Sequence, residues 1–126
     1  MQPKLSIIIP LYNAEKYISA CIESLFAQTV IEHVEILVVD DHGQDNSRVI
    51  VEQLQSQHSL GSCIRILSTP KNSGAWAARN LGISEAKGQW IGFVDADDWC
   101  EIDMYKNLLD AVNDYNVALQ SGDTSQ

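Results

Sequence analysis

Three carboxylates stand within four positions of the segment WIGFVDADDWC, at Asp95, Asp97 and Asp98. Carboxylates this close repel one another, so leaving all three unpaired would cost stability. A hard divalent cation removes that cost, because Mg²⁺ and Mn²⁺ bind carboxylate oxygens together with water and substrate phosphates. On an extended backbone Asp95 and Asp97 project to the same side, and Asp98 lies at the following turn. We therefore predict a metal site here; the alternative is a solvated acidic turn that caps a helix.

A second acidic pair, Asp40 and Asp41, follows the apolar run VEILVV. A carboxylate at the end of a strand can accept hydrogen bonds from a ribose hydroxyl or a base N–H, as acids do in dinucleotide folds. Because neighbouring strand residues face opposite sides, one of the two must point away from any ligand. We predict Asp41 as the binding residue, with a turn or helix-capping role as the alternative.

The segment NSGAWAARN carries a third polar group around the start of a predicted helix: Asn72, Gly74, Arg79 and Asn80. Free backbone N–H groups at such a helix start favour anions. Arg79 lies one turn into the helix and is a scarce cation in an acidic site. It is predicted either to bind a phosphate or to pair with a nearby aspartate.

These polar groups alternate with apolar runs that are typical of strands and helices. Two runs of β-branched residues, Ile7–Ile9 ended by Pro10 and Val34–Val39, predict strands buried on both sides. The segments SCIRILS and QWIGFVD predict a third strand and a fourth, buried strand. Helices are predicted in four intervals: from Asn13 as N-cap through NAEKYISACIESLFAQ with Tyr17 on its apolar stripe, from Asn46 or Ser47 to Leu54, from Gly74 to Ala86, and from Asp103 to Tyr115. A short fifth strand at Val117–Leu119 would follow.

Strands and helices that alternate at this spacing predict an α/β fold with a mainly parallel sheet and helices on both faces. Ligands bind such sheets outside the carboxyl ends of the strands. Four polar clusters fall there: Tyr12 and Asn13 after the first strand, then the two acidic groups and the TPKNSG segment. We expect them to converge on one edge of the sheet.

The composition limits the class of partner. The chain has 126 residues, with 8 Lys and Arg against 17 Asp and Glu, for a net charge of −9. That balance argues against nucleic-acid binding, which depends on clustered basic residues. No apolar segment approaches the roughly 20 residues of a membrane helix, and no secretory pattern opens the chain. Three cysteines without metal spacing complete the prediction of a cytoplasmic protein, with peripheral attachment at the inner face of the membrane left open.

Four segments in order, SIIIPLYNAEKYI, EILVVDDHGQDNS, NSGAWAARNLGI and GFVDADD, give a resemblance to glycosyltransferase family 2. Members of that family are inverting transferases of the GT-A fold, a Rossmann-like nucleotide-diphospho-sugar transferase fold. The resemblance covers Leu5 to about Leu119. It implies transfer of a sugar from a nucleotide-diphosphate donor, with a UDP-sugar favoured, to a hydroxyl of a glycan or lipid-linked acceptor in polysaccharide biosynthesis.

The resemblance also implies roles for individual residues. Pro10, Tyr12 and Asn13 would line the nucleotide pocket, and Asp41 would contact the base. The segment from Asn72 through Gly74 to Arg79 would lie under the donor. The acids of DADD match the DxD element, which implies that Asp97 and Asp98 reach the ribose and an Mn²⁺ or Mg²⁺ ion, with Asp95 as a further metal ligand.

Two departures from the family pattern bear on these expectations. His42 and Gly43 follow the acidic pair, where the family commonly has Gly and then Ser. No position matches the carboxylate that serves as general base toward the acceptor. We therefore expect residues 1–126 to be the nucleotide-sugar-binding part of a longer domain, with no catalytic residue identified and the base downstream of residue 126.

Two other classes remain as alternatives. The first is a non-catalytic nucleotide-sugar-binding fragment of the same fold. The second is a receiver-like phosphoacceptor domain, which is also a single α/β unit with aspartates around Mg²⁺. In a receiver the acids follow strands one and three, whereas here they follow strands two and four.

Overall fold

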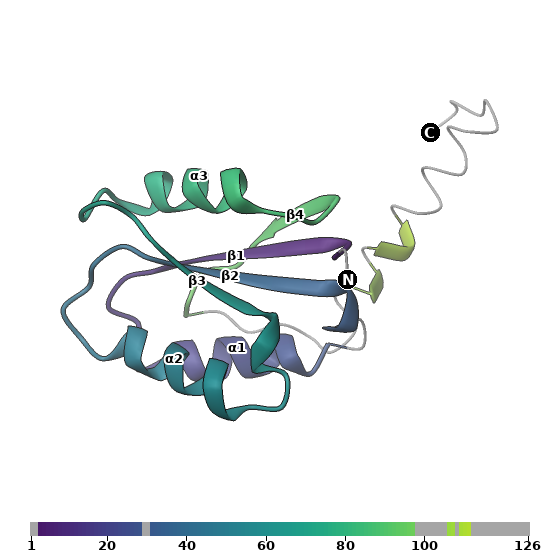
Figure 1. Cartoon of the computed structure of the whole chain (residues 1–126), viewed down its shortest axis with the longest axis horizontal. Coiled ribbons are helices and arrows are strands. Elements are labelled where there is room, and N and C mark those ends of the chain that lie inside the picture. Colours follow the sequence, from purple (N-terminus) through teal and green to yellow (C-terminus); the bar gives the residue numbers. More distant parts are fainter. Residues whose placement is uncertain (1–2, 29–30, 98–105, 108, 112–126) are drawn as a thin grey trace.

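The computed structural model describes residues 3–28, 31–97, 106–107 and 109–111. Four strands alternate with three helices along most of this length (Figure 1). The elements are β1 (Leu5–Leu11), α1 (Ile18–Phe26), β2 (Val34–Asp40), α2 (Ser47–Gln57), β3 (Ile64–Ser68), α3 (Ala75–Glu85) and β4 (Trp90–Phe93), with short 3-10 turns at Ile31–His33 and Gly61–Cys63. The predicted alternation of strands and helices is confirmed.

The four strands form one parallel sheet in the order β3-β2-β1-β4. Helices α1 and α2 cover one face and α3 covers the other (Figure 1). The sheet is therefore the predicted α/β arrangement with helices on both faces. Because all strands run the same way, their carboxyl ends share one edge, and the loops that carry the polar clusters meet there.

The hydrophobic core is larger on the α1 and α2 face than on the α3 face. Alternate residues of β1 and β2, including Ile7 and Ile36, pack with buried residues of α1 on the first face. On the second face Ile8, Leu37 and Val39 pack against Ala78 of α3. All seven residues of β2 are buried, as expected for a strand covered on both faces.

Helix α3 approaches the sheet closely at Gly82. A Cβ atom at this position would lie 2.6 Å from Cγ2 of the fully buried Ile8. Such a separation is too short for two carbon atoms in contact, so only glycine fits without displacing either the helix or Ile8. The packing fixes α3, and with it Arg79, over β1.

The prediction that Pro10 ends the first strand is wrong, since β1 continues to Leu11. The backbone carbonyl of Ile8 accepts a hydrogen bond from the N–H of Val94, on the β4 side. The backbone carbonyl of Leu11 accepts one from the N–H of Asp41, on the β2 side. Residues two apart face the same neighbour, so Pro10 faces the β4 side, where the ladder has already ended at the pair of Ile8 and Phe93. The missing N–H of proline therefore removes no ladder bond.

The prediction of a buried fourth strand is also wrong. Within the described part of the chain β4 pairs only with β1, and it is mostly exposed. Trp90, Ile91 and Phe93 are 39%, 40% and 49% exposed. Burial depends on which strand lies alongside, and an apolar run alone does not specify that neighbour.

The N-cap prediction for the first helix is wrong as well. Helix α1 begins at Ile18, with Tyr17 at the N-cap position and no side-chain cap. Asn13 instead has a left-handed backbone, with φ of 51°. Asparagine tolerates this conformation better than most residues. Its side-chain oxygen accepts a hydrogen bond from the backbone N–H of Gln44 and so joins two loops.

The second and third helices begin as predicted, with Asn46 and Gly74 at their N-cap positions. Of the predicted fourth helix, residues 106–107 and 109–111 are described and are helical. The predicted strand Val117–Leu119 lies outside the described residues. None of the described helices has the length and apolar character needed to cross a membrane.

Candidate functional site

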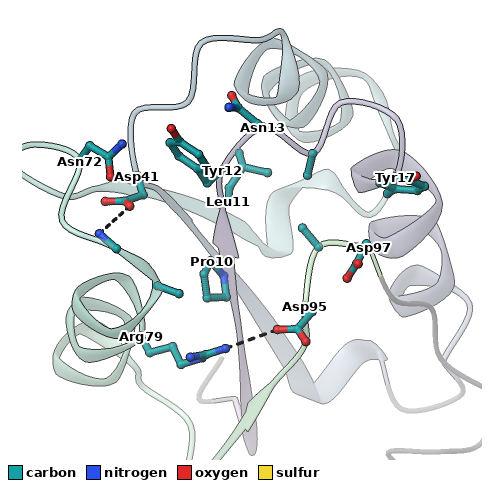
Figure 2. A pocket seen from close by; sticks show the side chains of 14 residues that line it. Pro10, Leu11, Tyr12, Asn13, Tyr17, Asp41, Asn72, Arg79, Asp95 and Asp97 are labelled. Atoms are coloured by element: carbon teal, nitrogen blue, oxygen red, sulfur yellow. Dashed lines mark hydrogen bonds and ion pairs between the residues drawn. The ribbon is translucent and has the colours of Figure 1, made fainter.

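A cavity of about 630 Å³ opens at the carboxyl ends of β1 and β2, between the start of α3 and the segment after β4 (Figure 2). Its lining comes from four separate parts of the sequence: Pro10, Leu11, Tyr12, Asn13, Ala14, Tyr17, Asp41, Asn72, Gly74, Ala75, Arg79, Asp95, Ala96 and Asp97. The edge of the sheet at which the polar clusters were expected to converge is the edge that carries this cavity.

The structure brings nine of the ten residues predicted for the site to this one cavity. They are Pro10, Tyr12, Asn13, Asp41, Asn72, Gly74, Arg79, Asp95 and Asp97. The tenth, Asp98, lies outside the described residues. The structure shows that these nine residues lie together, and the role of each in binding stays a prediction.

Asp41 is the most enclosed acid of the cavity, with 3% of its surface exposed. Its Oδ1 accepts hydrogen bonds from the Thr69 hydroxyl at 2.8 Å and the Ser73 N–H at 2.9 Å, and its Oδ2 accepts one from the Gly74 N–H at 2.8 Å. Burial alone would raise the pKa of Asp41, but these bonds, aided by His42, lower it below its usual value. Asp41 is therefore ionised at neutral pH.

The start of α3 was expected to attract an anion, and the carboxylate found there belongs to Asp41. The Gly74 N–H, at the N-cap position of α3, donates to Oδ2 of Asp41. Gly74 has a left-handed φ of 91°, and a Cβ there would meet no atom within 4 Å. Backbone conformation, and not space, therefore favours glycine at this turn. A carboxylate can accept about four hydrogen bonds, so Asp41 has capacity for about one more from a ligand.

Asp40 faces away from the cavity, as one member of the acidic pair had to do. Its carboxylate accepts bonds from Arg48 Nη1 at 2.9 Å and from the His42 N–H at 3.1 Å. Arg48 also donates to the hydroxyl of Ser68 at the end of β3. Asp40 and Arg48 therefore tie the end of β2, the start of α2 and the end of β3 together outside the cavity.

His42 occupies the position where the family commonly has glycine. It adopts a left-handed backbone with φ of 64°. Its Nε2 donates to the carbonyl oxygen of Thr69, whose hydroxyl in turn donates to Asp41. The imidazole bond and the bond from its own N–H to Asp40 hold this unusual backbone in place. The loop thus keeps a glycine-like conformation without glycine.

Arg79 and Asp95 form an ion pair across the cavity, with Nη2 and Oδ1 3.4 Å apart (Figure 2). The two side chains are 35% and 64% exposed, so the pair is accessible to solvent and contributes little to stability. Of the two predicted roles for Arg79, the structure has the pairing with an aspartate. A phosphate could replace that carboxylate as the partner without breaking a buried contact.

Asp95 and Asp97 line the same cavity, although β4 ends before them at Phe93. Val94 and Ala96 between and beside them are buried, so exposed and buried positions alternate and both acids point outward. Cys21 of α1 donates to the carbonyl oxygen of Asp95 at 3.6 Å and holds this segment against the core. Two carboxylates facing open space are an oxygen donor set suited to Mg²⁺ or Mn²⁺. Within residues 3–97 and the short described stretches beyond, no three His, Cys, Asp or Glu side chains are grouped to hold a metal.

Several residues of the cavity wall were not predicted from the sequence: Leu11, Ala14, Tyr17, Ala75 and Ala96. Tyr17 was placed on the buried stripe of α1, but it precedes that helix and is 54% exposed. Tyr12 is similarly exposed at 49%. The polar character of tyrosine was the available signal, since its hydroxyl favours a partly wet position. Two accessible aromatic rings suit stacking on a base or sugar.

The fold and the cavity define an α/β domain with a ligand-sized pocket at the carboxyl edge of its parallel sheet. The family model of Glycosyl transferase family 2 matches residues 6–125, and the chain belongs to that family. The resemblance noted from its four motifs is thereby confirmed.

Known proteins extend this comparison. Glycosyltransferase GlyG of Streptococcus pneumoniae serotype 4 is 34% identical over 122 residues, which are 97% of this chain and 39% of GlyG. The crystal structure of S. aureus TarS 1-349 superimposes with a TM-score of 0.81 at 30% identity, over 90% of this chain and 33% of that TarS fragment. The same TarS fragment in complex with UDP-GlcNAc gives a TM-score of 0.79 at 31% identity, over 90% of this chain and 32% of the fragment. The chain has the GT-A fold and spans about a third of the length of these relatives.

Proposed function

We propose that this chain is the nucleotide-sugar-binding part of an inverting, metal-assisted glycosyltransferase. The observation that carries the proposal is one cavity that brings together four kinds of contact. They are the buried hydrogen-bond acceptor Asp41, the accessible rings of Tyr12 and Tyr17, the guanidinium of Arg79, and the outward carboxylates of Asp95 and Asp97. These groups match the parts of a nucleotide-diphosphate sugar. The acceptor suits a base N–H, the tyrosine rings suit stacking on the base or sugar, and the guanidinium and carboxylates suit the diphosphate and a metal ion beside it. Membership in Glycosyl transferase family 2 supports the same reading.

In this proposal the base lies near Asp41, whose free acceptor capacity suits a base N–H. Pro10, Tyr12 and Asn13 form the wall beside it, and Asn72 and Gly74 lie beneath the donor. A UDP-sugar is the favoured donor, because the similar TarS fragment was crystallised in complex with UDP-GlcNAc. Asp41 could accept a hydrogen bond from the N–H of uracil.

Asp97 and Asp95, together with Asp98, would hold an Mn²⁺ or Mg²⁺ ion against the diphosphate. When bound, the cation would stabilise the negative charge that develops on the leaving nucleoside diphosphate. Arg79 sits opposite these acids, with its guanidinium within 3.4 Å of Asp95. It can stay with Asp95, where it limits repulsion among the acids, or turn to a phosphate oxygen.

The reaction proposed for the whole protein joins an acceptor hydroxyl, on a glycan or a lipid-linked sugar, to the anomeric carbon of the donor. The new carbon–oxygen bond forms on the face opposite the bond to the diphosphate, which breaks, so the configuration inverts. The hydroxyl proton passes to a general base, which we place downstream of residue 126 in an acceptor-binding part. We place this chemistry in the cytoplasm, at the inner membrane face if the acceptor is lipid-linked. Residues 1–126 alone would then bind donor without turnover.

Calorimetric titration of UDP, GDP, CDP and dTDP, with and without Mn²⁺, tests the proposal. We expect UDP to bind more tightly than the others and Mn²⁺ to strengthen its binding. Asp97→Asn should remove most of the Mn²⁺ effect, whereas Asp110→Asn, at an exposed carboxylate paired with Lys106, should leave it unchanged. Absence of nucleoside diphosphate binding, or binding that ignores both Mn²⁺ and Asp97→Asn, would overturn the proposal.

A further inference from the structure

Two loops at the carboxyl edge of the sheet are joined to each other by a set of hydrogen bonds and one close backbone approach. One loop, residues 12–17, connects β1 to α1 and supplies Tyr12, Asn13 and Tyr17 to the cavity wall. The other, residues 41–46, connects β2 to α2. We call their contacts the loop brace: it consists of the side chains of Asn13 and Asp45, the backbone N–H groups of Glu15 and Gln44, and Gly43.

At one end of the loop brace the two backbones come unusually close. The N–H of Gln44 donates to Oδ1 of Asn13 at 2.7 Å. A Cβ atom at Gly43 would lie 2.6 Å from that same oxygen and 2.8 Å from the backbone nitrogen of Asn13. Any residue larger than glycine would therefore push the two loops apart at this point.

Asp45 closes the other end of the loop brace. Its Oδ2 accepts the N–H of Glu15 at 3.0 Å, and its Oδ1 accepts both the N–H and the hydroxyl of Ser47, at 3.0 Å and 2.6 Å. One carboxylate thus joins the first loop to the start of α2. Burial opposes ionisation of Asp45, but these bonds outweigh it and lower the pKa below its usual value, in keeping with a permanent carboxylate.

The loop that the loop brace holds carries two cavity residues that are open to solvent. Tyr12 and Tyr17 are each about half exposed, so packing against the core restrains them weakly. The buried Ala14 anchors the middle of their loop and accepts the N–H groups of Tyr17 and Ile18. Fixing Glu15 from outside completes the restraint, because it holds the chain between Ala14 and Tyr17.

We infer that Asp45 is a positioning residue for nucleotide binding, which holds the 12–17 loop in its binding shape through the loop brace. Asp45 does not line the cavity and touches no proposed ligand. The inference rests on the proposed function, since it assigns Asp45 a part in the same site. It distinguishes Asp45 from a residue that only caps α2.

Asp45→Asn is the direct test. Asparagine has one acceptor oxygen for donors on two sides, so its amide N–H₂ would face either Glu15 or Ser47. We expect UDP to bind about five- to tenfold more weakly at 25 °C, and the backbone amide of Glu15 to exchange faster with solvent. Gly43→Ala strains the opposite end of the loop brace, and we expect it to weaken UDP binding in the same direction.

Ser47→Ala is the matched control. It removes the hydroxyl bond to Oδ1 of Asp45 and weakens the cap of α2, but it leaves Oδ2 and the Glu15 N–H in place. We expect it to lower the urea midpoint of unfolding and to leave UDP affinity unchanged.

The possible outcomes separate the inference from the proposed function. If the unmodified chain does not bind UDP, both the proposed function and the positioning role of Asp45 are wrong. If the unmodified chain binds UDP and Asp45→Asn, confirmed as folded by circular dichroism, binds it equally well, only the positioning role fails. Equal weakening by Ser47→Ala and Asp45→Asn also overturns it, because the effect would then pass through the α2 cap. An unfolded Asp45→Asn leaves Gly43→Ala to decide between these results.

Discussion

Asp41→Asn changes one atom of the most enclosed acid in the cavity, and its cost follows from the hydrogen bonds of that carboxylate. Asparagine can still accept the Thr69 hydroxyl and the Ser73 N–H through its single side-chain oxygen. Its amide nitrogen would then stand where Oδ2 now accepts the Gly74 N–H at 2.8 Å. Two donors would face each other in a site that is 3% exposed.

The expected magnitude comes from that lost acceptor. A hydrogen bond to a charged acceptor is worth about 1.5–3 kcal/mol, and a buried donor left without a partner costs a comparable amount. We therefore expect Asp41→Asn to lower the free energy of unfolding by about 2–3 kcal/mol. A base that donates to Asp41 loses a charged acceptor as well, so UDP affinity should fall at least about tenfold.

Urea unfolding at pH 7 and calorimetric UDP titration measure the two effects, and Asp40→Asn is the control. Asp40 is the neighbouring carboxylate, but it bonds Arg48 and His42 outside the cavity. Its ion pair with the 41% exposed Arg48 is partly screened, so we expect a stability loss of about 1 kcal/mol or less. UDP affinity should stay as in the unmodified chain. The reasoning is refuted if Asp41→Asn leaves the urea midpoint unchanged, or if Asp40→Asn weakens UDP binding as much as Asp41→Asn does.

Two further predictions concern the framework that holds the site. Gly82→Ala should lower the free energy of unfolding by about 1–2 kcal/mol although alanine favours helices, because its Cβ would lie 2.6 Å from Cγ2 of Ile8; a raised urea midpoint would contradict the close packing of α3. Glu35 on β2 accepts hydrogen bonds from the Ser6 hydroxyl and the Lys87 N–H and pairs with Arg65. Burial would raise the pKa values of Glu35, Asp41 and Asp45, but their hydrogen bonds outweigh it and hold all three below the usual values. Near pH 4 the unfolded chain therefore binds more protons than the folded one, so acid favours unfolding. The urea midpoint should therefore be steady from pH 8 to pH 6 and fall from about pH 5 to pH 3, with a smaller fall in Glu35→Gln; an equal fall in that variant would contradict the assignment to Glu35.

The sheet and the composition of the cavity could be predicted because both follow from local patterns. The runs around Ile8 and Leu37 specify parallel buried strands, and parallel strands bring the groups that follow them to one edge. That is why Asp41 and Asp97, 56 positions apart in the sequence, line one cavity. The opposite orientations of Asp40 and Asp41 followed from the alternation along a strand.

The features that the sequence left undetermined depend on contacts between distant segments. The exposure of β4 depends on its neighbour in the sheet, which an apolar run such as WIGF does not identify. The role of Asn13 depends on the N–H of Gln44 in another loop, so a local capping rule assigned it to a helix start instead. Tyr17 has the spacing of a helical stripe, and only the observed start of α1 at Ile18 places it in the cavity.

The central claim is that a nucleoside diphosphate binds in the cavity at the carboxyl edge of the sheet. Backbone amide shifts of the ¹⁵N-labelled chain, recorded by NMR during UDP titration with Mg²⁺, test it most directly. We predict saturable shifts at Tyr12, Asn13, Asp41 and Gly74. The chain also has a groove of about 300 Å³ between α1 and α2, lined by Ser19, Ile50, Gln53, Leu54, Gln57 and His58. Shifts confined to that groove, or no shifts at millimolar UDP, would contradict the claim.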